Sequence, residues 1–120
     1  MQFDRLTVDV GPGSRKGEKV IKVNGPLTMT SLLDFQTAVR AEKAPIVILD
    51  LSQVSYIDSA GLGSVVNAHI SCINAGRHLA LVGISDRVRT LFKIARLEHV
   101  LDIFPTLDDA EKFLSKPADA

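Results

Sequence analysis

The chain has 120 residues, of which 46% are hydrophobic, 23% charged and 5% aromatic, and its 14 Lys and Arg residues balance 14 Asp and Glu residues. One domain ordinarily occupies about 100 to 200 residues, so we expect a single domain, and the balanced charge argues against direct nucleic-acid binding. The longest apolar run, Ala44–Leu49, is far shorter than the roughly 20 residues that cross a bilayer, so we expect no membrane span. Any partner must therefore be recognised by local surface chemistry.

Cysteine and histidine usage points to an intracellular protein without a metal centre. Cys72 stands alone and cannot form an intramolecular disulfide, and Met1–Arg5 lacks the apolar core of a signal peptide, so we expect a cytoplasmic location. The spacing of His69, His78 and His99 is not that of metal ligands. We expect no metal and no cofactor, with Cys72 serving as a small hydrophobic residue.

The first quarter of the chain predicts a β-hairpin. Phe3–Val10 and Glu18–Val23 have the residue pattern of strands, and the Gly- and Pro-containing segment Gly11–Gly17 has the composition of a turn. This turn lacks the Gly-Lys-Ser/Thr ending of a phosphate-binding loop. The simplest arrangement is an antiparallel pair joined by a surface turn.

From residue 31 onward, helices and strands are predicted to alternate. Ser31 and Asp34 have the spacing of a capping box before a helix that reaches about Glu42, and Ile46–Leu51 is an aliphatic run typical of a central strand. The elements that follow are a helix over Ser59–Ala75 closed by Gly76, a strand at Leu79–Val82, a helix capped by Ser85, a strand at Val100–Phe104 and a helix opened by Thr106. The alternation predicts an α/β fold with parallel crossover units.

The helix over Ser59–Ala75 has two sequence stripes and no charged residue from Ala60 to Ala75. The larger apolar stripe predicts the buried face, and small polar residues predict a neutral face open to solvent. The two stripes are Leu62, Val66, Ile70 and Ile73, and Ser64, Asn67, Ser71 and Asn74. A neutral face favours close docking of another protein because little charge is desolvated, although a chance composition is equally open.

The segment Tyr56–Gly63 joins the central strand to this helix, and functional residues of open α/β sheets usually lie at the carboxyl ends of strands. Asp58 or Ser59 can serve as the helix N-cap, and the free N–H groups at a helix start tolerate added negative charge. A phosphate on Ser59 would therefore be accepted by the fold, yet Asp58 would repel it. The alternative is that Ser59 is a plain cap and that Gly61 and Gly63 only permit close packing.

The stretch Val47–Gly63, and above all its core Asp58-Ser59-Ala60-Gly61-Leu62-Gly63, resembles the signature of the STAS domain. Anti-sigma-factor antagonists and sulphate transporter tails share this domain. The resemblance implies one STAS-like domain over residues 1–115, with a mixed, mostly parallel sheet, an N-terminal antiparallel hairpin and about four helices. Residues 116–120 are expected to form a frayed tail.

The resemblance also implies a function. In antagonists of this type the serine matching Ser59 is phosphorylated by an anti-sigma factor that is itself a serine kinase; the unphosphorylated protein binds that kinase and releases a sigma factor. Phosphorylation ends the binding and a phosphatase restores it, so catalysis belongs to the partners and this chain is not expected to be an enzyme. The expected contact residues are Thr28, Asp58, Ser59, Ala60, Gly61, Leu62, Gly63, Ser64, Asn67 and Ser71. Family antagonists commonly carry Asp where this chain has Thr28.

Three other interpretations remain. A hydrolase with Ser59 as nucleophile would need Gly-x-Ser-x-Gly, but Ile57 occupies the first glycine position. A phosphate-accepting receiver domain would use Asp50, yet only Asp9 follows the first strand where an acidic pair should hold Mg²⁺. A STAS scaffold subunit that is never phosphorylated, in a stress-sensing or transporter-associated assembly, is favoured by the absence of the acid at Thr28.

Overall fold

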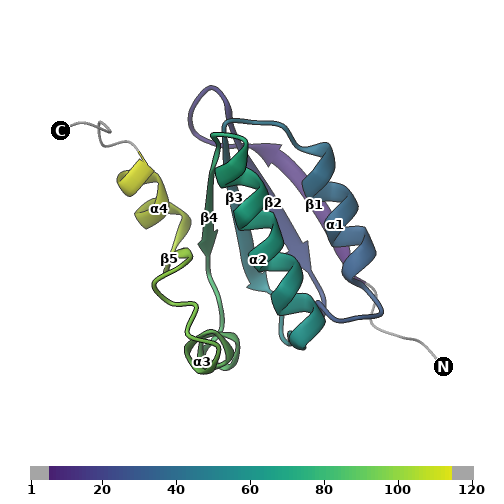
Figure 1. Ribbon diagram of the computed structural model, residues 1–120. Coiled ribbons are helices and arrows are strands. Elements are labelled where there is room, and N and C mark those ends of the chain that lie inside the picture. The colour runs from purple at the N-terminus through teal and green to yellow at the C-terminus, as the bar shows by residue number, and fades with distance from the viewer. Residues whose placement is uncertain (1–5, 115–120) are drawn as a thin grey trace.

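The computed structural model describes residues 6–114 and shows one mixed five-stranded sheet with helices packed on its two faces (Figure 1). The sheet order is β1-β2-β3-β4-β5; β1 and β2 are antiparallel, and the other neighbouring pairs are parallel. The elements are β1 (Thr7–Pro12), β2 (Glu18–Asn24), α1 (Leu32–Ala41), β3 (Ile46–Gln53), α2 (Ser59–Asn74), β4 (His78–Val82), α3 (Asp86–Ile94), β5 (Asp102–Phe104) and α4 (Leu107–Leu114). The expected fold class is confirmed.

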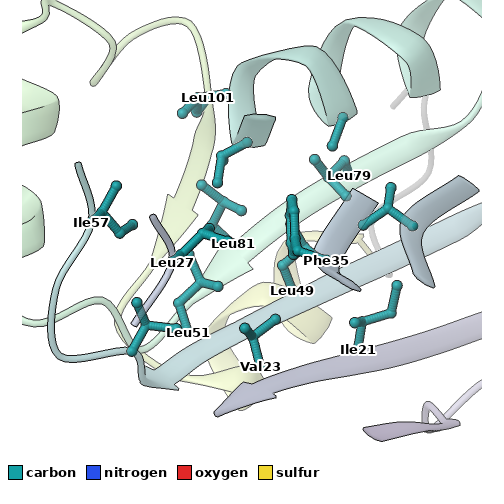
Figure 2. Packing of buried hydrophobic residues seen from close by; sticks show 14 of the residues in the cluster. Ile21, Val23, Leu27, Phe35, Leu49, Leu51, Ile57, Leu79, Leu81 and Leu101 are labelled. Carbon is teal, nitrogen blue, oxygen red and sulfur yellow. The ribbon is translucent and has the colours of Figure 1, made fainter. Parts of the chain in front are cut away.

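The middle strand β3 contributes to the core on both faces of the sheet. Its residues Val47, Leu49 and Leu51 belong to a large apolar cluster under α1, α2 and α3, much of which is drawn in Figure 2. Ile48 points to the opposite face and packs in a smaller cluster with Ala110 of α4. A strand that is buried on both sides favours a continuous aliphatic run. The run Ile46–Leu51 therefore indicated a central strand from the sequence alone.

Most elements lie where the sequence placed them. The hairpin, the central strand and Gly76 after α2 are confirmed, and Gly76 has the positive φ of 72° that favours glycine after a helix. Part of the predicted first strand, Phe3–Arg5, and the expected tail at 116–120 lie outside the described residues. Over residues 6–114, no helix combines the length and apolarity needed to cross a membrane.

Two of the predicted helix caps are confirmed and one is wrong. The hydroxyls of Ser85 and Thr106 accept backbone N–H groups from the first turns of α3 and α4. Ser31 precedes α1 but makes no side-chain cap bond. Its hydroxyl instead donates to the Pro26 carbonyl at 2.8 Å and accepts from the Thr28 N–H at 3.0 Å, because the chain before α1 folds back on itself. Ser31 therefore holds the loop that faces the start of α2.

The predicted buried face of α2 is right at the start of the helix and wrong at its end. Leu62 packs against the core, whereas Ile70 and Ile73 of the same stripe are 46% and 57% exposed. The buried residues of α2 are Gly61, Ser64, Val65, Ala68, His69 and Cys72. The reason is a close approach that local periodicity does not encode: a methyl group on Gly61 would lie 2.1 Å from the Leu27 carbonyl oxygen. The helix therefore buries the side that contains Gly61 and leaves Ile70 and Ile73 on the surface.

A pair of carboxyl groups, of which Glu18 is buried and Glu111 partly exposed, joins the β1–β2 turn to α4, at the opposite end of β2 from the turn that precedes α1. Glu18 is buried at the start of β2, accepts from the Ser14 N–H at 2.9 Å and hydrogen bonds to Glu111. Burial is the main cause that raises the Glu18 pKa, and it outweighs Arg15, whose Nη2 lies 3.3 Å from Glu18 Oε1. The hydrogen bond from Glu18 lowers the pKa of Glu111. Of the two carboxyl groups, Glu18 therefore keeps its proton to the higher pH.

We expect this pair to make stability depend on pH in a defined direction. The raised pKa of Glu18 contributes stability that is complete below its ordinary value of 4.5 and is lost as the pH rises through the folded-state value. Glu111 has a lowered pKa, so its contribution is lost only as the pH falls below the same ordinary value of 4.5. Glu18→Gln keeps a donor toward Glu111 but does not titrate.

Urea unfolding of both proteins from pH 4.5 to neutrality should show the wild type losing stability relative to Glu18→Gln as the pH rises. Parallel pH profiles for the two proteins would contradict the assignment of the proton to Glu18.

Candidate functional site

The start of α2 lies against the segment that precedes α1. Leu27 forms an isolated parallel bridge with Ile57; its N–H donates to the Tyr56 carbonyl at 3.0 Å, and its carbonyl accepts from the Asp58 N–H at 3.3 Å. Leu27 and Ile57 are both buried, and Figure 2 shows them among the core side chains. This short pairing brings Thr28 to the loop that carries Asp58 and Ser59.

Asp58 is the N-cap of α2 and also ties the two segments together. Its Oδ1 accepts from the Gly61 N–H at 2.8 Å, and its Oδ2 accepts from the Met29 N–H at 3.0 Å. These two hydrogen bonds, with that from Gly61 the larger, hold the Asp58 pKa below its ordinary value of 3.8. Asp58 is therefore ionised at neutral pH, and of the two residues considered for the cap, Asp58 occupies it.

Ser59 is the first residue of α2, and its side chain is exposed. Its hydroxyl makes no side-chain hydrogen bond to any other part of residues 6–114, since the capping role belongs to Asp58. The Ser59 oxygen is thus open to an incoming group while its backbone is held at the helix start. The plain-cap interpretation of Ser59 is wrong for this reason.

The two glycines of the first turns have different roles. Gly61 is buried against Leu27, where no side chain fits. Gly63 is exposed and has open space around its Cα, so packing against the rest of the chain does not require a glycine there. The packing role expected of both residues therefore holds for Gly61 alone, and Gly63 leaves a bare surface near Ser59.

An apolar groove of about 310 Å³ runs beside Ser59, between the start of α2 and one side of α3. Among the described residues, Asp58 is its only charged lining residue, and the others are Tyr56, Ile57, Ser59, Leu62, Leu91, Ile94 and Ala95. Ile94 is 74% exposed, and Met29, whose N–H binds Asp58, is 72% exposed. Exposed apolar side chains therefore stand on both sides of the Asp58–Ser59 pair.

Of the ten expected contact residues, six come together at the start of α2, two lie in a second groove, and Gly61 and Ser64 are buried. Thr28, Asp58, Ser59, Ala60, Leu62 and Gly63 come together at the start of α2. Ser64, which was expected on the solvent face, is 4% exposed and donates to the Gly61 carbonyl at 2.7 Å. Asn67 and Ser71 line a second groove, against α1. The neutral polar stripe is therefore not one continuous face beside Ser59.

Sequence reasoning missed Met29, Tyr56 and Ile94. One signal was available for Ile94, because it is a large apolar residue outside the helical stripe of Val88, Leu91, Phe92 and Ala95. Met29 and Tyr56 stand in loops and carry no periodic signal. Their position follows only from the pairing of Leu27 with Ile57.

The two enzymatic or phosphate-accepting alternatives find no support in this geometry. Within residues 6–114, no histidine lines the groove beside Ser59. Asp9 lies on the edge strand β1, opposite Lys22 of β2, and Asp50 lies one strand further on. Strands are about 4.8 Å apart, so Asp9 and Asp50 are separated by roughly two strand spacings.

Residues 13–110 match the STAS domain family, and the chain belongs to this family. Among curated proteins, the anti-sigma-B factor antagonist of Staphylococcus aureus is 31% identical over 86 residues, 69% of this chain and 80% of that protein. The anti-sigma-B factor antagonist of Listeria monocytogenes is 44% identical over 55 residues. That match covers 46% of this chain and spans about half, 48%, of the Listeria protein.

The fold is shared with solved structures. An anti-sigma factor antagonist from Mycobacterium paratuberculosis superposes with a TM-score of 0.80 at 23% identity, over 92% of this chain and 95% of that one. The likeness confirms a STAS arrangement of sheet and helices.

The two glycines provide a matched test of the packing at the start of α2. Gly61→Ala places a methyl group against the Leu27 backbone, so we expect a loss of roughly 1 to 3 kcal/mol in the free energy of unfolding. Gly63→Ala meets no atom within 4 Å and should be neutral or gain up to about 1 kcal/mol from helix propensity. Urea denaturation measures both, and similar effects of the two substitutions would contradict the close approach.

Asp58 should contribute to stability through both of its hydrogen bonds. Asp58→Ala removes the cap and the bond from Met29, so we expect a loss of about 1 to 2 kcal/mol, while Asp58→Asn keeps one acceptor oxygen and should lose less. Because its pKa is lowered, the contribution of the charge is present above the ordinary value of 3.8 and is lost as the pH falls through the folded-state value. The stability gap between wild type and Asp58→Asn should narrow below pH 3.8; a constant gap would overturn this role of the charge.

Proposed function

We propose that this protein is an anti-sigma-factor antagonist that binds an anti-sigma serine kinase, releases a sigma factor and is switched off by phosphorylation at Ser59. The observation that carries the proposal is the exposed Ser59 hydroxyl, without a side-chain hydrogen bond, at a helix start beside an ionised carboxylate. The curated names of the Staphylococcus and Listeria relatives support the same role. Action in the cytoplasm and reversal by a phosphatase belong to this proposal.

Phosphorylation at Ser59 would change the surface without breaking the fold. The positive end of the α2 dipole lies at this residue and favours added negative charge. A phosphoserine carries about −1.5 to −2 at neutral pH, so with Asp58 the local charge would reach roughly −3. None of the described residues that line the groove beside it is a cation. A docked partner would have to desolvate this charge, and the complex would weaken.

The unmodified surface is suited to a protein partner. The groove with Leu62, Leu91 and Ile94 offers apolar area to bury, and Gly63 adds a place where a partner backbone can approach closely. Interface cores are depleted of charged residues, as this surface is apart from Asp58. We therefore propose that the kinase docks over this groove and that Ser59 accepts the phosphate group.

A STAS scaffold subunit without phosphorylation is the second candidate. The observation that favours it is that Thr28 is uncharged. Thr28 lies between Leu27, which forms the bridge with Ile57, and Met29, which hydrogen bonds to Asp58. With Asp at this position, a second carboxylate would stand near Ser59. A scaffold subunit would bind its partner through the same groove but would not change with kinase and ATP.

A kinase assay distinguishes the two candidates. Incubation with ATP and an anti-sigma kinase encoded in the same genome should add a single phosphate, located at Ser59 by mass spectrometry of peptides. Ser59→Ala should remain unmodified, whereas Ser55→Ala, which removes another exposed serine nearby, should be modified like the wild type. Binding of the wild-type protein without modification would reject the switch and support the scaffold.

The docking surface is tested by two exposed apolar residues. Ile94→Glu places a charge in the groove rim, so we expect at least about tenfold weaker kinase binding by isothermal titration calorimetry, with little change in stability because Ile94 is 74% exposed. Val10→Glu, at a 50% exposed position on the edge strand β1, is the control and should bind like the wild type. Equal kinase binding by both variants would show that the docking surface does not include α3.

A further inference from the structure

A second groove of about 310 Å³ lies between α1 and α2, which run side by side over one face of the sheet (Figure 1). It is distinct from the groove beside Ser59, and the two share no lining residue. Its floor is apolar, with Val39 and Ala68 among its residues, and one wall carries the small polar side chains of Asn67 and Ser71. The uncharged stripe of α2 therefore forms part of a cavity wall.

In the described part of the chain, three cations line this groove and no carboxylate does. Arg40 and Lys43 come from the end of α1 and the residues after it, and Arg77 follows α2. Within residues 6–114, none of the three forms an ion pair. Three positive charges without counter-ions around one cavity favour an anionic ligand.

Arg77 is held in place before any ligand arrives. Its Nη1 donates to the carbonyls of Glu42 and Ala44, at 3.1 and 3.3 Å, which fixes the guanidinium at the end of the groove. Its other guanidinium nitrogens make no hydrogen bond to the remainder of residues 6–114. A fixed guanidinium with donors to spare is suited to a planar carboxylate or a phosphate, because little side-chain freedom is lost on binding.

Negative charge near the groove does not cancel these cations. The C-termini of α1 and α2 contribute about −0.5 each through their dipoles. Glu42 lies nearby, but its carboxylate accepts the Ala44 N–H at 2.9 Å and does not line the groove. The two helix dipoles and the Glu42 carboxylate together contribute about −2. The three cations contribute +3, so the net charge around the groove is roughly +1. The negative ends of the two helices alone therefore do not account for all three cations.

We propose that the α1–α2 groove binds a small organic anion, with an apolar body on the floor of Val39 and Ala68 and a phosphate or carboxylate head against Arg77, Arg40 and Lys43. Binding pockets for small ligands typically combine an apolar lining with a few placed polar groups, and begin at about 300 Å³. The site is independent of the proposed switch at Ser59, since it involves the other side and the later turns of α2.

The test is a titration of the full ¹⁵N-labelled chain with phenyl phosphate, followed by amide chemical shifts. We expect saturable changes at Asn67, Ser71 and Arg77. Inorganic phosphate, which lacks the apolar body, and phenol, which lacks the charge, should each bind at least about tenfold more weakly. Benzoate replaces the phosphate head by a carboxylate, and the tighter of the two aromatic anions identifies the head group.

Arg40→Gln/Lys43→Gln should weaken phenyl phosphate binding at least about tenfold, because both side chains line the groove and neither is needed for an ion pair. Arg87→Gln/Arg89→Gln removes the same charge from α3 and should bind within about twofold of the wild type. Absence of saturable binding, shifts confined to α3, or equal losses in both double variants would overturn the proposal.

Discussion

The Asp58 carboxylate joins two parts of the chain that are far apart in sequence, and the site depends on this link. One oxygen accepts from Gly61 and begins α2, and the other accepts from Met29 in the segment before α1. The bridge between Leu27 and Ile57 and the absence of a side chain at Gly61 allow the two segments to touch. Since Asp58 takes the capping role, Ser59 is left with a free hydroxyl at the helix start.

The same link explains the surface around Ser59. The close approach at Gly61 turns this side of α2 toward the core and leaves Ile70 and Ile73 exposed. Met29 is held on one side of Asp58, and the groove that reaches Ile94 lies on the other. An ionised carboxylate within an apolar surface can accept a neutral partner, but a second anion beside it would be repelled. The close contact at Gly61 and the charge of Asp58 therefore both shape the surface at the start of α2.

Local signals predicted the fold well because they are determined by neighbouring residues. The β3 run, the β1–β2 hairpin and Gly76 after α2 needed no long-range information. The later part of the α2 face was predicted wrongly because apolar residues lie on two sides of this helix, one with Ile70 and Ile73 and one with Ala68 and Cys72. Periodicity could not choose between these sides, whereas the contact of Gly61 with Leu27 fixes the orientation. The Asp58–Ser59 pair was found from its motif.

Other parts of the Ser59 site and of the α1–α2 groove could not have been predicted from local patterns. Met29 reaches Asp58 through tertiary pairing, and Arg77 lies near Arg40 only because α1 and α2 lie side by side. The zero net charge of the sequence likewise hides an uneven distribution, since among the described residues three cations line the α1–α2 groove and none lines the groove beside Ser59. Such groupings depend on the fold and not on neighbouring residues in the sequence.

The most direct test of the central claim is the dissociation constant of the anti-sigma kinase for this protein with and without a phosphate on Ser59, measured with the two purified forms under identical salt. Desolvation and repulsion of the added charge beside Asp58 predict a loss of about 3 kcal/mol, which is roughly 100-fold weaker binding. Equal dissociation constants for the two forms would contradict the account.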